Sequence, residues 1–205
     1  GGAISNEGSL TIEDCSISNG LVLEGSAIWN KGLLAISDSS FTNNESFNDG
    51  GAIWNDSLLE VSNSTFHGNS AGRTMLGNGV GSGGAIWSIG VASILDSEFS
   101  ENTASSNGGA IGNEGTVSIS EGTFSKNAAD SQGGGIFSSG LLEVVDSNFA
   151  DNDADVGGGA VSSRGTMDII ASAFSGNSSK EGGAVFNTTG VIFDCTFYRN
   201  TSTYK

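Results

Sequence analysis

Residues 108–132 read GGAIGNEGTVSISEGTFSKNAADSQ, and variants of this stretch fill the whole chain of 205 residues. Its opening block, Gly-Gly-Ala-Ile, returns in recognisable form eight times, beginning at Gly1, Gly25, Gly50, Gly83, Gly108, Gly133, Gly158 and Gly182. The blocks follow one another every 24 or 25 residues, except for one spacing of 33 that indicates an eight-residue insertion within 71–82. A fixed period of this length is typical of a solenoid.

Each unit contains three short runs in which apolar and polar residues alternate, separated by glycine, asparagine, aspartate and serine. In the quoted unit these runs contain Ile111, the pair Val117 and Ile119, and Phe124. Alternation with period two is typical of β-strands, and the separating residues favour turns. A leucine-rich repeat has a similar length, but it needs a helical segment that this glycine-rich unit disfavours. The sequence therefore predicts an all-β, right-handed parallel β-helix of eight coils with three short strands per coil.

This prediction makes residues 1–205 a single β-helix segment with a loop insertion at 71–82. Because the first residues already lie inside the repeat, we expect the segment to be part of a longer chain.

Stacked coils place equivalent residues about 4.8 Å apart, so each column of the repeat becomes a ladder. We expect a core column at Phe41, Phe66, Phe99, Phe124, Phe149, Phe174 and Phe197. Three residues after each phenylalanine stands an asparagine: Asn44, Asn69, Asn102, Asn127, Asn152, Asn177 and Asn200. An amide side chain both donates and accepts hydrogen bonds, so stacked asparagines can bond to one another and to the turn backbone. We interpret this asparagine ladder as structural.

Charge and hydropathy exclude two classes of partner. The chain has 7 lysine and arginine residues against 23 aspartate and glutamate residues, a formal net charge of −16. Such a surface repels phosphate backbones and anionic lipids, so we expect no nucleic-acid partner. The sequence contains no run of 18 apolar residues, so we expect no membrane span in this segment.

The alternation of Gly-Gly-Ala-Ile with Phe-x-x-Asn through the whole chain resembles the repeats of the polymorphic outer-membrane proteins of chlamydial autotransporters and of related bacterial surface β-helix proteins. The resemblance implies an extracellular or cell-surface passenger segment that acts in adhesion. We expect a protein or glycan surface ligand as partner and no cofactor. A structural alternative is a subunit whose copies stack end to end into a fibre.

Two other functions of β-helices are disfavoured by the sequence. A polysaccharide-active enzyme needs clustered carboxylates and basic groups in a cleft, whereas the basic residues here are scattered and the single histidine, His67, follows a core phenylalanine. We therefore expect no enzymatic activity. An ice-binding face needs a regular row of Ser and Thr, and the outward columns beside the phenylalanines are irregular.

Two features raise the possibility of calcium binding. An acidic column comprises Asp14, Asp38, Asp96, Glu121, Asp146 and Asp194. We prefer to interpret its residues as Asx turns, in which each side chain accepts a bond from its own turn backbone, because Asn63 occupies the same column. The second feature is the alternating acids Asp151, Asp153 and Asp155, which are weak candidates because the rest of an EF-hand loop is missing.

The column after each Ile of Gly-Gly-Ala-Ile contains large aromatic residues at Trp29, Trp54, Trp87 and Phe137. Strand alternation directs this column outward, and an exposed aromatic stripe is typical of a binding surface. We predict a partner-binding face at these four residues together with Arg73 of the insertion. The alternative is that the insertion or a neighbouring domain covers the stripe.

The two cysteines, Cys15 and Cys195, share a column that is otherwise mostly serine. Seven coil steps separate them, roughly 34 Å at the strand spacing, so they cannot form a disulfide with each other. Because we expect the column to point inward, we predict two small buried thiols.

Overall fold

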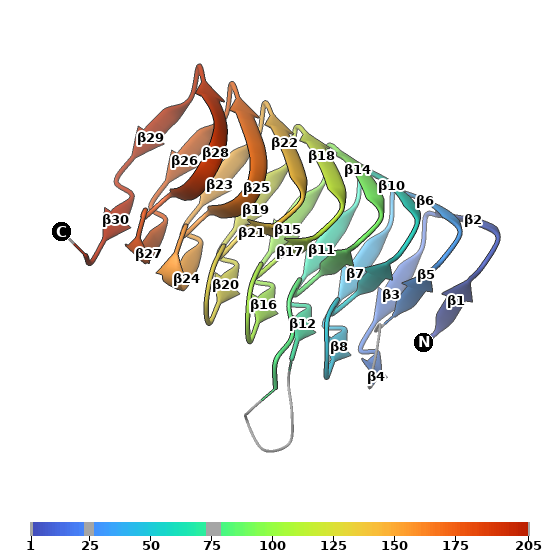
Figure 1. Cartoon of the computed structure of the whole chain (residues 1–205). Helices are drawn as coiled ribbons and strands as arrows, with labels where there is room; N and C mark the ends of the chain where they lie inside the picture. The colour runs from blue at the N-terminus through green and yellow to red at the C-terminus, as the bar shows by residue number, and fades with distance from the viewer. Residues whose placement is uncertain (1, 23–26, 73–78, 205) are drawn as a thin grey trace.

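The computed structural model describes residues 2–22, 27–72 and 79–204. It is an all-β solenoid in which eight coils follow one another from the N-terminus to the C-terminus (Figure 1). All pairs between neighbouring strands of the described residues are parallel, as in the pairs of β10 with β6 and with β14. The predicted class, a parallel β-helix with about 25 residues per coil, is confirmed.

The strands form three sheets that run the length of the stack. The largest contains both the Gly-Gly-Ala-Ile strands and the Leu-x-Ile strands, which merge in the last two coils into β25 (Val161–Ile170) and β28 (Val185–Phe193). Its first set is β1 (Ile4–Asn6), β5 (Ile28–Asn30), β9 (Ile53–Asn55), β13 (Ile86–Ser88), β17 (Ile111–Asn113) and β21 (Ile136–Ser138). Its second set is β2 (Ser9–Glu13), β6 (Leu33–Ser37), β10 (Leu58–Ser62), β14 (Val91–Leu95), β18 (Thr116–Ser120) and β22 (Leu141–Val145).

The phenylalanine strands form the second sheet, and a short strand beyond each of them forms the third. The second sheet is β3 (Ser16–Ser18), β7 (Ser40–Thr42), β11 (Thr65–His67), β15 (Glu98–Ser100), β19 (Thr123–Ser125), β23 (Asn148–Ala150), β26 (Ala173–Ser175) and β29 (Thr196–Tyr198). The third is β4 (Leu21–Val22), β8 (Glu45–Ser46), β12 (Ser70–Ala71), β16 (Thr103–Ala104), β20 (Ala128–Ala129), β24 (Asp153–Gly157), β27 (Ser178–Glu181) and β30 (Thr201–Ser202). Each coil thus contains the three predicted strands and, after the phenylalanine strand, one further short strand.

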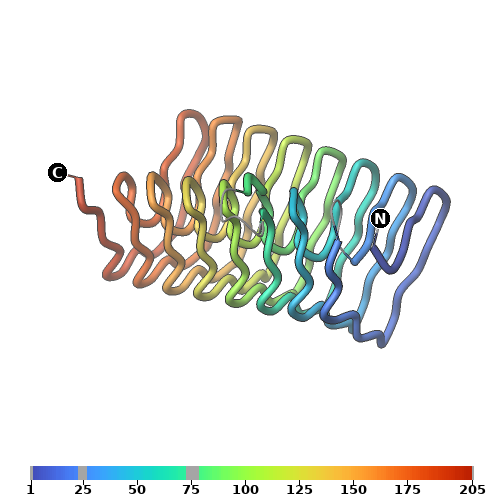
Figure 2. The backbone as a smooth tube through the Cα atoms, turned by 90° about the horizontal axis from the view of Figure 1, so that it is seen from below, coloured from blue at the N-terminus to red at the C-terminus, as the bar shows by residue number. Residues whose placement is uncertain are grey.

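The pairing register aligns the repeat columns, so identical residues meet across neighbouring coils. Phe66 pairs with Phe41 on one side and with Phe99 on the other. The rings of the phenylalanine column stack face to face, with centroids 4.8–4.9 Å apart and interplanar angles of 3–8°. Figure 2 shows the resulting row of similar coils from below. The core is therefore a set of continuous apolar ladders.

The two glycines of Gly-Gly-Ala-Ile are required for different physical reasons. The first, as at Gly108, has a positive φ (+69°), a conformation that side chains disfavour. The second, as at Gly109, lies so close to the next coil that a Cβ would stand 2.1 Å from the carbonyl oxygen of Gly134. A third glycine column behaves like the second, since a Cβ on Gly115 would stand 2.0 Å from the carbonyl oxygen of Gly90.

The predicted acidic column forms a left-handed turn between the Leu-x-Ile and phenylalanine strands. All eight of its residues have φ between 44° and 56°: Asp14, Asp38, Asn63, Asp96, Glu121, Asp146, Ala171 and Asp194. Aspartate and asparagine tolerate this conformation better than other side chains do. Backbone conformation thus accounts for the preference for Asp and Asn in this column, and the Ala at 171 shows that the turn forms without a polar side chain.

The cysteine column points inward, yet the prediction of two buried thiols is wrong. The serines of the column, such as Ser64 and Ser97, are buried. Cys15 is exposed and Cys195 is half-buried, and both are free thiols. They lie in the first and last coils, where no further described coil covers them. Position along the stack, not the column, decides their exposure.

Candidate functional site

From Asn44 to Asn177, the asparagines that follow the phenylalanines are buried and bonded to both neighbouring coils, whereas Asn200 in the last described coil is half-buried. The Asn102 side-chain Nδ2 donates to Asn127 Oδ1 (3.0 Å) and to the carbonyl oxygen of Phe66 (2.9 Å). Its Oδ1 accepts hydrogen bonds from the backbone N–H and the Nδ2 of Asn69. The same pattern extends from Asn44 to Asn200. These side chains hold turns together and are closed to ligands.

A second asparagine column, at the end of the Gly-Gly-Ala-Ile strands, is less regular. Asn30 donates to Asn55 Oδ1 at 2.7 Å, but Asn55 then meets the hydroxyl of Ser88 at 3.1 Å. The shorter serine does not reach the next coil, so the Oδ1 of Asn113 is buried without a hydrogen-bond partner. Ser163 Oγ is a second such buried atom among the described residues. A buried acceptor left unpaired costs free energy, so the serine substitutions weaken this column.

The column that contains the cysteines forms a hydroxyl ladder that the sequence did not suggest. Ser64 Oγ donates to the carbonyl oxygen of Ser62 at 2.7 Å and accepts the backbone N–H of Ser39 at 3.2 Å. Cys195 replaces the serine at one end, where its thiol contacts the carbonyl oxygen of Phe193 at 3.3 Å. The sequence signal was a serine directly after the turn residue in five of the eight coils.

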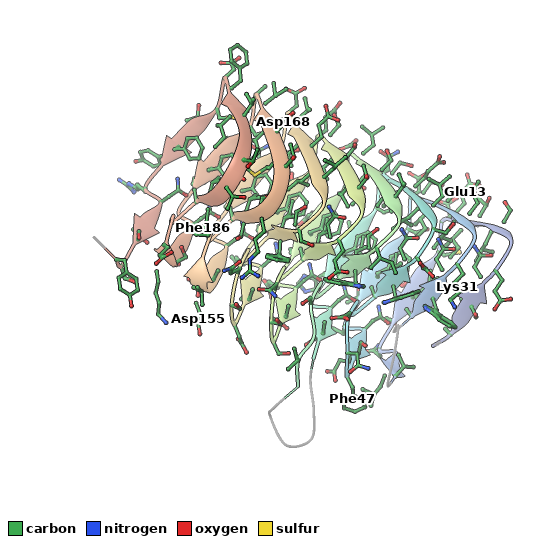
Figure 3. The ribbon with its side chains drawn as sticks, viewed as in Figure 1. Glu13, Lys31, Phe47, Asp155, Asp168 and Phe186 are labelled. Carbon is green, nitrogen blue, oxygen red and sulfur yellow. The ribbon has the colours of Figure 1, made fainter. Side chains whose placement is uncertain are left out.

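The aromatic column is half-exposed at its N-terminal end. Trp29 and Trp54 pair in register, with ring centroids 5.5 Å apart and planes tilted by 50°. The ammonium group of Lys31 lies 4.3 Å from the centroid of the Trp29 ring. Lys31 is labelled in Figure 3, beside β5. Two indole rings and one ammonium group therefore share an accessible surface.

Further along the column, the prediction of an exposed stripe is wrong. Trp87 is 9% exposed and Phe137 is 6% exposed. The ring of Trp87 lies over Gly112 of the next coil, where an added Cβ would stand 2.4 Å from the indole. The missing side chain at 112 provides the space that buries Trp87. The guanidinium of Arg164 lies 5.7 Å from the centroid of the Phe137 ring. Arg73, the remaining predicted partner-binding residue, lies outside the described residues.

The predicted calcium ligands do not form a site with each other. Asp151 occupies a second left-handed turn (φ 56°), whereas Asp153 and Asp155 belong to strand β24. Asp153 accepts a hydrogen bond from the hydroxyl of Ser178. Within residues 2–22, 27–72 and 79–204, no three His, Cys, Asp or Glu side chains come together in a group that could hold a metal ion.

One pair of side chains resembles part of a catalytic arrangement. His67 Nδ1 lies 3.1 Å from Ser100 Oγ across strands β11 and β15. The pair lies in the open on the outer side of the phenylalanine sheet, where His67 is exposed. Nucleophilic catalysis needs a third orienting group and a pocket for the substrate, and neither accompanies this pair in the described structure.

Comparison with known protein families finds a repeat that follows the residue columns described above. A family model, the Chlamydia polymorphic membrane protein repeat, matches residues 38–56, 96–114, 121–139 and 171–188. These four stretches are similar to the repeat of that family. Each matched stretch starts at the left-handed acidic turn and runs through Phe-x-x-Asn and the paired glycines. The motif resemblance predicted from the sequence is confirmed.

The repeat of this family therefore coincides with the turns and ladders that build the coil. No curated protein and no solved structure matches the chain. The described residues contain no helix long and apolar enough to cross a membrane. The matched repeat family suggests a surface β-helix resembling an autotransporter passenger.

Proposed function

We propose that the chain is a non-catalytic binding scaffold displayed at the cell surface, where it acts in adhesion. The repeat of a polymorphic membrane protein supports surface display. The burial pattern supports a scaffold, because the repeated Phe, Asn and Ile residues face inward and leave only the outward columns to vary. Variable outward residues on a constant coil are the arrangement expected of a binding surface on a repeat protein.

The single observation that carries a binding role is the half-exposed pair of Trp29 and Trp54 with Lys31 above it. Tryptophan rings provide flat apolar surfaces that pack against sugar rings or partner side chains, and tryptophan is enriched at binding hot spots. The adjacent ammonium group adds a donor at the rim. We infer a protein or glycan surface ligand that contacts both indoles.

Binding of the purified protein to a glycan array and to cultured cells tests this function. We expect the double variant Trp29→Ser, Trp54→Ser to lose at least about tenfold in affinity, since interface tryptophans often contribute 2 kcal/mol or more. Tyr198→Ser is the matched control, because it removes an exposed aromatic side chain from a different sheet. Equal binding by all three proteins, or no binding by the unmodified chain, would contradict the proposal.

End-to-end stacking of copies into a fibre is the alternative function. Filaments in electron micrographs of the purified protein would support the fibre instead.

A further inference from the structure

The outer side of the Leu-x-Ile strands differs from the rest of the surface. Strands β6, β10, β14, β18 and β22 pair in register, so their outward residues form three columns along the stack. We call the surface made by these outward residues the aliphatic face. It occupies the side of the coils where Glu13 and Asp168 are labelled in Figure 3.

Large aliphatic side chains on this face are exposed although a polar residue would fit there. One edge column contains Leu33 (39% exposed), Val91 (49%) and Leu141 (55%), and the opposite edge contains Leu95 (46%). Thr116 stands in the same column as Leu141 and pairs directly with it. The fold therefore does not require an apolar residue at these positions, and exposed aliphatic groups gathered on one face indicate a contact surface.

The face is hollowed between its middle and edge columns. A cavity of about 260 Å³ lies over β6, β10 and β14, lined by Ala35, Ile36, Ser37, Glu60, Val61, Ser62, Ser93 and Leu95. The hollow exists because four outward positions carry only Ala or Ser, beside the larger Glu60 and Leu95. Its size suits one aliphatic side chain of a partner, with the Glu60 carboxylate near it.

Every charged residue in these three outward columns, counted over all eight coils, is acidic: Glu13, Glu60, Glu143 and Asp168. A second copy of this chain would bring like charges together, and its net charge is −16. An anionic lipid surface is repelled for the same reason. Charge complementarity therefore selects a cationic partner, and the exposed aliphatic groups require that it also be apolar.

We propose that the aliphatic face is a docking surface for a basic amphipathic peptide segment, in which an aliphatic residue fills the hollow and Lys or Arg residues pair with Glu60 and Glu143. This surface is made by other strands than the tryptophan pair, which lies on β5 and β9, and the proposal does not depend on that pair. The strands of this face also lie outside the four stretches that match the repeat family. None of the matched stretches, 38–56, 96–114, 121–139 and 171–188, includes β6, β10, β14, β18 or β22. The repeat builds the coil, and the aliphatic face adds a separate function to it.

The test uses the whole chain and a fluorescent peptide of eight residues with the repeat Leu-Leu-Lys-Lys, which spans roughly 26 Å when extended and presents both Leu and Lys on the side that faces the protein. A peptide with the repeat Ser-Ser-Lys-Lys has the same charge without the aliphatic groups. Fluorescence anisotropy should show that the Leu–Lys peptide binds at least about tenfold more tightly than the Ser–Lys peptide. Equal binding of the two peptides would overturn the proposal, because attraction to net charge alone would then explain it.

Three double variants locate the binding site, the third of them as a control. Val91→Thr with Leu141→Thr copies the threonine found at 116 in the same column, so folding should be unchanged while the advantage of the Leu–Lys peptide falls severalfold. Glu60→Gln with Glu143→Gln should weaken binding, whereas Asp38→Asn with Asp96→Asn removes equal charge from the turn column and should not. Equal weakening by both charge pairs would overturn the proposal. If the unmodified chain forms a dimer or binds lipid vesicles, and the Val91, Leu141 double variant does not, the partner of this face is a second copy or a lipid surface. Either result would overturn the proposal of a peptide partner.

Discussion

At the residue scale, the glycine that precedes each Leu-x-Ile strand shows how closely the coils approach. A Cβ on Gly115 would stand 2.0 Å from the carbonyl oxygen of Gly90, whereas a Cβ on Gly8, in the same column of the first coil, meets no atom within 4 Å. One column thus provides both a severe substitution and its control.

We expect Gly115→Ala to lower the free energy of unfolding by about 3 kcal/mol or more, because two coils must separate locally to admit the methyl group. Gly8→Ala should change it by less than about 0.5 kcal/mol. Chemical denaturation followed by circular dichroism measures both values. A similar small effect at Gly115 would show that the coil spacing is looser than the structure indicates.

The unpaired Oδ1 of Asn113 gives a second prediction at this scale. In Ser88→Asn, the new amide can donate to Asn113 as Asn30 donates to Asn55, which should stabilise the protein by about 1 kcal/mol. The reverse change, Asn30→Ser, should destabilise it by a similar or larger amount. Thermal melts of both variants measure the effect, and a lower melting temperature for Ser88→Asn would contradict this assignment.

Asp49 is the one described group with a resolved pKa shift. Burial raises the pKa of its carboxyl above 3.8, the hydrogen bond from the Ser82 N–H opposes this, and Glu114 adds repulsion. A raised pKa in the folded state means that the protonated form is favoured by folding. Its contribution to stability is therefore full below about pH 3.8 and is lost as the pH rises through the raised pKa.

In Asp49→Asn this titration disappears. The unfolding free energy of the unmodified protein minus that of the variant should therefore decrease as the pH rises from about 3 to 7. Urea unfolding of both proteins at several pH values measures this difference. Because both proteins contain the other carboxylates, their contribution cancels in the subtraction. A difference that increased with pH would mean that the Ser82 hydrogen bond outweighs the effect of burial.

At the element scale, the phenylalanine stack was predictable from the sequence, whereas the exposure of its members was not. Phe99 is fully buried between Phe66 and Phe124, but Phe197 is 47% exposed at the end of the stack. Equal residues in one column therefore differ in environment, because only an inner coil has neighbours on both sides.

We expect Phe99→Ala to cost about 3–5 kcal/mol, the usual range for a buried phenylalanine. Phe197→Ala should cost less than half of that, because a large part of its ring is already in water. Equilibrium unfolding of the two variants gives the comparison. Equal costs would indicate that something covers the last coil in solution.

At the scale of the whole molecule, the stack is quasi-one-dimensional, since each coil contacts only its neighbours. The last coil exposes Ile192 and Phe197, residues of the core columns. Hydrogen exchange of the chain should therefore be slowest in β13 to β22 and fastest in β28 to β30. Mass spectrometry of proteolytic fragments measures this gradient, and uniform protection along the stack would contradict it.

The sequence by itself determined the coil, the columns and the register, because a repeat of 24 or 25 residues with period-two alternation assigns each residue a strand, a column and a side. It also indicated the type of repeat that the family model matches. The tertiary structure decided which outward residues are exposed, since alternation shows that a side chain leaves the strand outward but not what lies above it. The absence of a side chain at Gly112 leaves room for the Trp87 ring, which is therefore buried. Cys15 and Cys195 lie in the end coils, where no further described coil covers them. The small residues Ala35 and Ser93 leave a hollow in the aliphatic face.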